Sequence, residues 1–410
     1  PKETSDRDHR VIGKELGLFT FSDTVGKGLP LWTAKGAVLR RELERFITDE
    51  EIKRGYQHVV TPDIAKIDLY KKSGHYPYYK ESMYAPIDID GEEFMLRPMA
   101  CPHHFELYLS EPRSYRDLPM RIAELAKMYR YELSGVLSGL VRVRGFCLSD
   151  AHIICADRAQ AEQEVAGVLD LIDHFAGIFG LRKGADYWYR LSLGAREDSK
   201  KYYKDDAAWD EAEEVLRSVL KKRGESFAEA KNEAAFYGPK IDVQMKDIRG
   251  LENTAFTVQY DFVMPKRFKL VYTDKSGAEK EAVVLHRSSV GALERLIAFL
   301  IEKYDGVFPL WLAPVQVKVL PVGEKFLSYA RQIHEALRTA GIRSELDDSN
   351  ETLGKKVRSA KVQKVPYWAV VGEKEAKENA VALESRAGEK HTLSLPETIT
   401  LLENQVAEKK

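Results

Sequence analysis

The sequence predicts an α+β protein of two domains, an antiparallel sheet flanked by helices followed by a small α/β domain. Two observations lead to this prediction. Between about residues 120 and 290, several strand patterns follow one another while helical patterns are set apart, which is typical of an antiparallel sheet. From residue 315 onward, strand and helix patterns alternate over about 100 residues, a normal size for a separate domain.

The composition is that of an ordinary globular protein. The 410 residues are 44% hydrophobic and 31% charged, with a formal net charge of −1. No apolar run is long enough to cross a bilayer, and the polar start PKETSDRDHR does not resemble a signal peptide, so we expect a cytoplasmic protein with no membrane contact. Cys101, Cys147 and Cys155 form no CxxC pair, which argues against a disulfide framework. Overall neutrality argues against bulk coating of nucleic acid but allows local basic patches that bind RNA.

The first part of the chain predicts one helix and several strands. Val38, Leu39, Leu43 and Phe46 recur at helical spacing and predict an amphipathic helix over 31–54. The following HVVTPDI predicts a short strand that ends at Pro62, and residues 93–97 and 121–131 also carry strand patterns. The segment YELSGVLSGLVRVRGFCL predicts a hairpin, with a Ser/Gly-rich turn and an alternating return strand at LVRVRGF.

The second part of the chain continues with a long helix. Asp157 is the expected N-cap of a helix that runs to about Phe179, with Val165, Leu169 and Ile172 on its apolar face. A charged helix near 206–222 and strands at IDVQMKD, FTVQYDF, FKLVYTD and EAVVLHR follow. After a Pro-containing linker at 309–314, the expected order is strand (VQVKVLPV), helix (324–340), strand (IRSELDD), helix (352–362), strand (YWAVVG). The predicted domains are therefore 1–312 and 313–410.

The segment LRPMACPHHFELYL places Cys101, His103 and His104 within four positions. A zinc site needs three or four ligands, and adjacent histidines on a helix point about 100° apart. A cysteine is also often a small buried residue. His152 and His286, each within an apolar, strand-like segment, fit either a ligand or a hydrogen-bonded core histidine. The local patterns alone leave both interpretations open.

Four arginines lie on or beside predicted strands or a helix with a buried face, where a charge is costly without a partner: Arg130, Arg142, Arg144 and Arg295. On a strand, Arg130 and Glu132 would share one face, as would Arg142 and Arg144. Together with the ring of Phe146, this set favours a nucleotide site, where arginine binds phosphate, glutamate accepts from the adenine amino group and phenylalanine stacks on the base. The alternative is an exposed sheet face with surface ion pairs.

These segments resemble the three motifs of class II aminoacyl-tRNA synthetases, and specifically those of the threonyl family. KRGYQHVVTPDI resembles motif 1, YRYELSGVLSGLVRVRGF resembles motif 2, and VGALERLIAFLIEKY resembles motif 3. Further similar blocks cover nearly the whole chain: DHRVIGKELGLFTFS, LPLWTAKGAVLRRELE, SGHYPYYKESMY, LRPMACPHH, SDAHIIC, FYGPKIDV, TVQYDF and FPLWLAPVQV. The resemblance implies a class II catalytic domain at 1–312 and an anticodon-binding domain at 313–410.

The resemblance also implies a zinc site that recognises the substrate. Three residues match the family's zinc ligands, with one ion per chain: Cys101, His152 and His286. Such an ion would take the amino group and the hydroxyl of L-threonine, which valine lacks. Asp150 matches the carboxylate that accepts from the hydroxyl, Tyr237 matches the tyrosine near the amino group, and Met99 lines the pocket. His103 and His104 are then left with supporting or structural roles.

By the same resemblance, six positions bind ATP, which enters with Mg²⁺: Arg130, Glu132, Arg142, Phe146, Gln259 and Arg295. Arg130 would hold the α-phosphate and the substrate carboxylate. Glu132 and Phe146 would contact the adenine, and Arg142 and Arg295 the γ-phosphate. Gln259 falls near the substrate and its adenylate.

Three positions are matched to tRNA. His75 matches the family histidine beside the terminal ribose, where it would relay a proton. In the last domain, Glu375 and Arg358 fall near the regions that contact the anticodon, whose bases would be recognised at their edges. The implied partner is tRNA(Thr).

The sequence also departs from the family pattern. Leu148 and Thr254 stand where glutamines are expected near the substrate, and Glu384 stands where an arginine that recognises an anticodon base is expected. The family's N-terminal modules, one of which hydrolyses mischarged seryl-tRNA, would precede DHRVIG. We therefore expect either a fragment or a natural form that lacks these modules.

The resemblance thus implies a homodimeric, cytoplasmic enzyme that charges tRNA(Thr) with L-threonine. A seryl or prolyl relative is one alternative, but it is not expected to combine Cys101, His152 and His286 with FYGPK. The other alternative is a non-catalytic, synthetase-like regulator that binds RNA. Such a regulator has no physical reason to keep Arg130 and Arg295 as buried charges.

Overall fold

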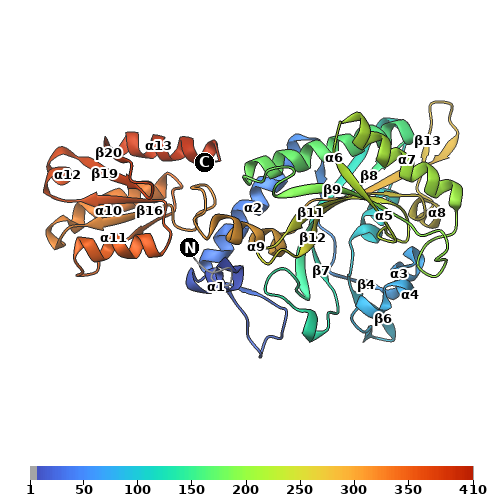
Figure 1. The fold of residues 1–410 in the computed structure, drawn as a ribbon, viewed down its shortest axis with the longest axis horizontal. Coiled ribbons are helices and arrows are strands. Elements are labelled where there is room, and N and C mark those ends of the chain that lie inside the picture. Colours follow the sequence, from blue (N-terminus) through green and yellow to red (C-terminus); the bar gives the residue numbers. More distant parts are fainter. Residues whose placement is uncertain (1–6, 410) are drawn as a thin grey trace. The chain divides into compact units, whose positions relative to one another are not determined.

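The computed structural model describes residues 7–409 (Figure 1). The chain divides into two compact units. The first unit holds Leu31–Arg45 and the described parts of Pro1–Thr20 and Phe299–Lys410, and the second unit holds Phe21–Pro30 and Phe46–Ala298. Two helices, α2 (Ala34–Lys53) and α9 (Leu293–Tyr304), have residues in both units. A functional boundary at residues 312 and 313 stays a prediction.

The second unit is built on an eight-stranded sheet with the order β10-β9-β11-β12-β15-β8-β7-β3. The inner neighbours pair antiparallel, and only the two end strands pair parallel, β10 with β9 and β3 with β7. The predicted α+β class is therefore confirmed. The strands are β3 (Gln57–His58), β7 (Met120–Tyr129), β8 (Gly145–Cys155), β9 (Tyr187–Leu193), β10 (Phe227–Lys231), β11 (Lys240–Lys246), β12 (Glu252–Asp261) and β15 (Val283–Ala292).

Two helices cover one face of this sheet, α6 (Arg158–Ile178) and α7 (Asp206–Lys222), and they also pack on each other (Figure 1). Asp157 caps α6 as predicted, because its side chain accepts a hydrogen bond from the Gln160 backbone N–H. Val165, Leu169 and Ile172 are fully buried, so the predicted apolar face is confirmed. Because α6 and α7 cover this face of the sheet, only the opposite face is available for a functional site.

The predicted hairpin is present, but its return strand begins later than expected. β7 ends at Tyr129 and β8 begins at Gly145, with these two residues paired. Arg130, Glu132, Arg142 and Arg144 therefore lie in the connecting loop, and the expectation that they share strand faces was wrong. The loop turns back on itself between Ser138 and Arg142, and the Arg144 backbone N–H bonds to the Gly28 carbonyl instead of to β7. The alternation of Val and Arg resembles a strand in the sequence, but the backbone of this segment bonds to Gly28 and within the loop instead of to β7.

Short elements complete the second unit. The strand predicted in HVVTPDI is reduced to β3, which precedes Pro62, and the strand predicted at 93–97 is β6. The strands β4 (Ile64–Lys66), β6 (Glu92–Leu96) and β5 (Ile87–Ile89) form one small sheet, and β13 (Val271–Thr273) pairs with β14 (Glu279–Glu281). The helices are α3 (Ile67–Ser73), α4 (His75–Tyr78), α5 (Cys101–Leu109) and α8 (Met264–Phe268), with 3₁₀ turns at Lys80–Ser82, Tyr115–Asp117 and Ser134–Val136.

The C-terminal part of the first unit has the predicted alternation of strands and helices. Its five-stranded sheet has the order β17-β16-β18-β19-β20, with β16 parallel to both β17 and β18. Helices α10 and α13 contribute to one apolar cluster and α11 to another, so the helices cover both faces. The elements are β16 (Val317–Pro321), a 3₁₀ turn (Glu324–Phe326), α10 (Leu327–Thr339), β17 (Ser344–Leu346), α11 (Leu353–Val362), β18 (Tyr367–Val371), α12 (Glu373–Glu378), β19 (Ala380–Ser385), β20 (Lys390–Ser394) and α13 (Leu395–Ala407).

The N-terminal part of the first unit is small. It contains α1 (His9–Glu15) and the short hairpin of β1 (Phe19–Thr20) and β2 (Leu31–Trp32), followed by α2. The helix predicted over 31–54 is α2, and its Leu39 and Leu43 are fully buried, as an amphipathic helix requires. Within residues 7–409, no helix combines the length and the apolar character that crossing a membrane would need.

A buried ion pair fixes the last turns of α2 to the second unit's sheet. Glu51 lies 2.7 Å from the Arg287 guanidinium on β15, and both side chains are almost completely excluded from water. The same carboxylate accepts hydrogen bonds from Ser149 on β8 and Ser289 on β15, and it pairs with His58 on β3. One carboxylate thus ties α2 to three strands.

We expect Glu51→Leu to lower the free energy of unfolding of the second unit by about 3–5 kcal/mol, because it leaves the Arg287 charge buried without its partner. Urea denaturation measures the loss. The double variant Glu51→Leu with Arg287→Met should recover much of it. Arg217→Met, which removes a partly exposed pair with Glu229, is the control and should cost less than about 1 kcal/mol. Equal losses in Glu51→Leu and the control would contradict the anchoring role.

Candidate active site

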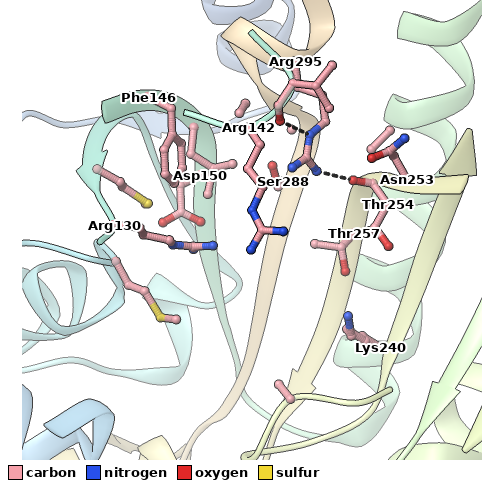
Figure 2. A pocket seen from close by; sticks show the side chains of 18 of the residues that line it. Arg130, Arg142, Phe146, Asp150, Lys240, Asn253, Thr254, Thr257, Ser288 and Arg295 are labelled. Atoms are coloured by element: carbon pink, nitrogen blue, oxygen red, sulfur yellow. Dashed lines mark hydrogen bonds between the residues drawn. The ribbon is translucent and has the colours of Figure 1, made fainter. Parts of the chain in front are cut away.

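A cavity of about 730 Å³ opens on the face of the second unit's sheet (Figure 2). The strand register explains which side chains line it. His152 on β8 pairs with His286 on β15, His286 pairs with Gln259 on β12, and Gln259 pairs with Lys240 on β11. These four residues form one row across four strands, and all four line the cavity. The register thus gathers residues from 152 to 286 into a single line.

Alternation along each strand extends this row into a floor. On β8, every second side chain faces the cavity, from Phe146 through Leu148 and Asp150 to His152. On β15, Ser288 follows His286 in the same way, and on β12 Thr257 precedes Gln259. The intervening side chains of β8, such as Ile153, are buried on the other face.

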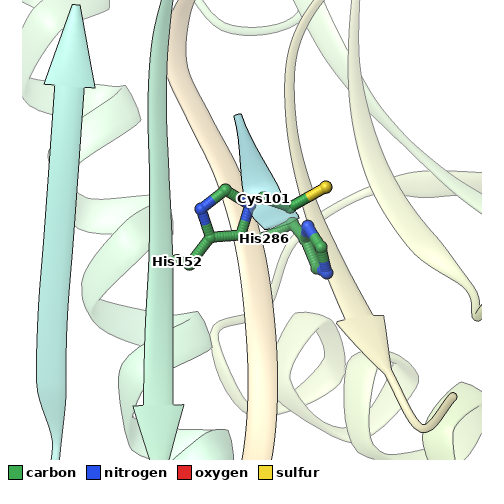
Figure 3. A group of neighbouring side chains, drawn as sticks. All are labelled: Cys101, His152 and His286. Carbon is green, nitrogen blue, oxygen red and sulfur yellow. The ribbon is translucent and has the colours of Figure 1, made fainter. Parts of the chain in front are cut away.

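Cys101, His152 and His286 come together at one end of this floor (Figure 3). One ligand atom from each residue lies within 4.8 Å of the others, and all three side chains are buried. The two histidines face each other across β8 and β15, with ring centroids 4.5 Å apart. Cys101 is supplied by the first residue of α5, which packs against β8. His103, the neighbour that first suggested a metal, is not part of this group.

The chemistry of this cluster fits a zinc ion. Burial raises the pKa of the Cys101 thiol and lowers the pKa of His152, so the histidine is held neutral, which is the form that binds metals. A cation would offset the burial of a thiolate. One sulfur and two imidazoles are donors typical of zinc, and three protein ligands leave a position for a substrate.

A carboxylate lies beside the cluster on the same strand face. Asp150 is buried two residues from His152, and burial raises the pKa of its carboxyl group. Such a group accepts strongly from a hydroxyl that enters the cavity, because little water competes for it. The predicted neighbours are also present. Tyr237 donates to the Gln259 side chain and stacks on His286, with ring centroids 4.8 Å apart, and Met99 lines the cavity.

Three arginines line the other end of the cavity. Figure 2 shows Arg130 and Arg142 reaching into it, while Arg295 on α9 is held by the carbonyls of Val141 and Thr254, at 3.2 and 2.7 Å. Burial and the nearby charges of Arg130 and Arg142 lower the pKa of Arg295. Three cations gathered in this way favour a polyanionic ligand.

The remaining predicted nucleotide contacts lie beside these arginines. The Arg130 guanidinium lies over the Phe146 ring, 5.2 Å from its centroid. Glu132 pairs with Arg142 at 2.9 Å. The predicted ATP-binding residues are thus gathered around one cavity, although two of them bind each other in this structure.

Several buried polar atoms on the cavity wall have no hydrogen-bond partner among the described residues. They include Nε of Arg130, Oγ1 of Thr257 and Oγ of Ser288. Buried polar groups are nearly always paired, so these atoms indicate a polar ligand. Prediction from the sequence missed Thr257 and Ser288, but their two-residue spacing from Gln259 and His286 was a usable signal.

His75 lies behind the cavity wall. Its ring is fully buried, its Nδ1 lies 2.8 Å from the Ser73 hydroxyl, and its Nε2 lies 3.9 Å from the Cys101 sulfur. Burial lowers the pKa of His75 to about 3, so the ring is neutral. A role beside the terminal ribose of tRNA stays a prediction.

The two residues matched to the anticodon lie in the first unit. Arg358 is exposed on α11, whereas Glu375 accepts a hydrogen bond from the Gly372 backbone N–H and caps α12. Glu384, one of the departures, lies on β19 with its carboxylate 3.7 Å from Lys390. The anticodon contacts therefore stay predictions.

The other two departures lie at the cavity. Leu148 places an apolar side chain in the floor between Phe146 and Asp150. Thr254 contributes its carbonyl to Arg295, and its hydroxyl accepts a hydrogen bond from Gln244. The contacts of these two residues in the structure therefore do not require a glutamine at either position.

Two family models match this chain. The model described as "tRNA synthetase class II core domain (G, H, P, S and T)" matches residues 81–304, and the model described as "Anticodon binding domain" matches residues 316–405. Among solved structures, the RNA binding domain of threonyl-tRNA synthetase from Cryptosporidium parvum Iowa II is similar, with a TM-score of 0.91 and 35% identity. That alignment covers 97% of this chain and 98% of that chain.

The curated relatives that resemble this chain are longer than it is. The chain is 49% identical over 412 residues to the threonine--tRNA ligase of Geobacillus kaustophilus (strain HTA426), covering 100% of this chain and 62% of that relative. It is 49% identical over 382 residues to the threonine--tRNA ligase of Staphylococcus aureus (strain Newman), covering 93% of this chain and 59% of that relative. The chain thus spans less than two thirds of the length of these relatives.

The arginine cluster predicts a response to polyphosphate. Tripolyphosphate at 100 times its Kd should stabilise the chain by about 2.7 kcal/mol, seen as a rise in Tm. Arg295→Met should remove most of this rise, which is measured against the Tm of the same variant without ligand, because the variant loses the hydrogen bonds to Val141 and Thr254 as well as a buried like charge. Arg144→Met is the matched control, since the Arg144 guanidinium bonds to the carbonyls of Lys27 and Glu132. Loss of the response in the control but not in Arg295→Met would refute the assignment.

Proposed function

The chain belongs to the class II aminoacyl-tRNA synthetases, in the threonyl family, and from that premise we propose that it activates L-threonine with ATP and transfers it to tRNA(Thr). The resemblance found in the sequence motifs, and the class II core followed by an anticodon-binding domain, are thereby confirmed. The activity, the substrates and a cytoplasmic location are part of the proposal, since the chain spans only 62% of its Geobacillus relative.

One observation carries the proposal: Cys101, His152 and His286 gather beside Asp150 in the cavity that also holds the arginines. A zinc ion on the three ligands would supply a Lewis-acid position for the amino group and hydroxyl of threonine. Asp150 accepts a hydrogen bond from that hydroxyl, and Met99 and the ring of Tyr237 restrict the space around the side chain. Valine has no hydroxyl to offer, so the polar groups of the site would be left unpaired.

The arginines orient the two reactants for adenylate formation. Arg130 binds the threonine carboxylate and the α-phosphate, and Arg142 and Arg295 bind the γ-phosphate of ATP, which enters with Mg²⁺. A carboxylate oxygen of threonine attacks the α-phosphorus in line, and the bond to the leaving pyrophosphate breaks. The guanidinium groups offset the charge that develops on the phosphate oxygens, so no protein nucleophile is required.

The adenine is bound at the end of the cavity near β8. Phe146 stacks on the base, and Glu132 accepts from the adenine amino group. For this contact, Glu132 gives up its pair with Arg142, whose side chain is 51% exposed. An exposed pair of this kind is worth about 0–1 kcal/mol, so the exchange costs little.

Transfer to tRNA completes the reaction. A hydroxyl of the terminal ribose attacks the threonyl carbonyl carbon, AMP leaves, and His75 is the proposed proton relay. Glu375 and Arg358 are the proposed anticodon contacts in the first unit. A synthetase-like regulator without catalytic activity remains the rival function, and the following experiment separates the two.

Amino-acid-dependent exchange of pyrophosphate into ATP tests the activity. We expect exchange with threonine, exchange with serine about 10–200-fold weaker because serine lacks only a methyl group, and exchange with valine about 10⁴-fold weaker because valine lacks the hydroxyl. A chelator selective for Zn²⁺, with Mg²⁺ kept in excess, should abolish the threonine reaction, and Cys101→Ala should behave like the chelated protein.

Cys155→Ala is the matched control, because Cys155 is also a buried free cysteine but lies at the end of β8, outside the cluster. It should keep full exchange. Equal exchange with valine and threonine would rule out recognition of the hydroxyl, and no exchange with any amino acid would favour the regulator.

The homodimer is also part of the proposal. β3 is an end strand of the second unit's sheet and pairs over only two residues. Just beyond it, Val60 is 93% exposed, and Ile52 on α2 is 53% exposed. An unprotected edge beside exposed apolar side chains is typical of a surface that pairs with another chain.

We expect a dimer in sedimentation velocity, and Val60→Asp should raise its Kd at least about 10-fold because it places a charge within the apolar contact. Leu251→Asp, at another exposed apolar position, is the control and should leave the Kd unchanged. A monomeric chain with full exchange activity would argue against the dimer.

A further inference from the structure

A buried carboxylate lies behind the metal-ligand cluster, on β7. Glu124 accepts hydrogen bonds from the Thr61 backbone N–H at 3.1 Å and the Thr61 hydroxyl at 2.7 Å. It also pairs with the Arg97 guanidinium at 3.2 Å and with Nε2 of His104 at 3.1 Å. Burial alone would raise the pKa of Glu124, but the hydrogen bonds from His104 and Thr61 outweigh it and lower the pKa to about 2. Glu124 is therefore an ionised acceptor.

His104 connects this carboxylate to the cluster. It is fully buried, and its Nδ1 lies 2.8 Å from Nδ1 of His152. Residues three apart share one face of a helix, so α5 presents Cys101 and His104 to the same side. His103 is turned away from that face and packs near Tyr70, with ring centroids 6.2 Å apart. The two adjacent histidines thus have different surroundings.

The contacts indicate one arrangement of the protons. An ionised carboxylate cannot donate, so Nε2 of His104 carries the hydrogen that faces Glu124. With its hydrogen at Nε2, His104 offers a lone pair at Nδ1 that accepts from Nδ1–H of His152. That arrangement leaves Nε2 of His152 as a lone pair, available to a metal ion.

His286 is held in a different way. Its Nε2 lies 2.6 Å from Asp261, whose other carboxylate oxygen accepts from the backbone N–H groups of Val263 and Met264 at 2.8 and 2.9 Å. Because Asp261 occupies Nε2, Nδ1 is the nitrogen of His286 that is left for the ion. Asp261 thus supports His286 directly, whereas Glu124 supports His152 through the imidazole of His104.

We propose that Glu124 and His104 form a relay that orients His152 and fixes its tautomer, so both are positioning residues of the zinc site. The inference rests on the proposed zinc site and adds two residues to it. Arg97 pairs with Glu124 and offsets its charge. The relay therefore orients the His152 ring without adding an unpaired carboxylate near Asp150. Such supporting contacts are worth about 10–100-fold in metal affinity.

The test is the Zn²⁺ affinity of the full chain, measured by competition with a chromophoric chelator. We expect one Zn²⁺ per chain, and an affinity about 10–100-fold weaker in His104→Phe, which fills the same space without a hydrogen bond. His103→Phe changes the neighbouring histidine and should bind Zn²⁺ as tightly as the unsubstituted chain. Absorption spectra of the Co²⁺-loaded proteins should change in His104→Phe and not in His103→Phe.

His104→Gln tests rescue, because its amide offers one donor to Glu124 and one acceptor to His152, and it should restore most of the affinity. If His104→Phe does not fold, Glu124→Gln perturbs the same relay one bond further away and should weaken Zn²⁺ binding by about 10-fold. An unsubstituted chain that binds no Zn²⁺ would overturn the zinc site itself. Tight Zn²⁺ binding that persists in His104→Phe, or in Glu124→Gln, would overturn the relay alone.

Discussion

The register between β8 and β15 is the constraint on which the site depends. It places His152 opposite His286 and Asp150 opposite Ser288. A slip of one residue would turn every one of these side chains to the face covered by α6 and α7, because side chains on a strand alternate. The buried Glu51–Arg287 pair joins α2 to both strands at this point, so the register is fixed by an ion pair as well as by backbone hydrogen bonds.

Buried charge is handled differently in the two halves of the cavity. Near the metal-ligand cluster, two buried carboxylates have partners within the protein, as Glu124 has Arg97 and Asp261 has His286. Near the arginines, Nε of Arg130 has no partner among residues 7–409, and the pKa of Arg295 is lowered by burial and by neighbouring cations. In the proposed function, the first half is organised before a substrate arrives, whereas the second is completed by an anion.

Much of the fold follows from the sequence, but the site follows only in part. Helix α6 is predicted by Asp157 as its N-cap and by the helical spacing of its apolar residues, and both signals are local in the sequence. The sequence predicts a Ser/Gly-rich turn within 130–144 but wrongly extends the flanking strands into it, because the Arg144 backbone N–H bonds to Gly28, a partner far away in the chain. The resemblance assigns Cys101, His152 and His286 as ligands and leaves His104 a supporting or structural role without naming its partner. Its contact with His152 arises because α5 packs on β8, and the spacing of residues along the sequence does not predict that packing.

The two halves of the cavity also differ in how readily they can change shape. His104 is buried and bonded through both ring nitrogens, to Glu124 and to His152, so moving either histidine breaks a hydrogen bond that no water replaces. The Arg142 side chain is 51% exposed, so its pair with Glu132 is worth about 0–1 kcal/mol, and the loop that carries the pair can exchange partners in the proposed nucleotide complex. In the proposed function, selection of the amino acid uses the rigid part, since distinguishing a hydroxyl from a methyl requires fixed positions. The proposed nucleotide binding uses the adjustable part, where a strong anion supplies the energy for rearrangement.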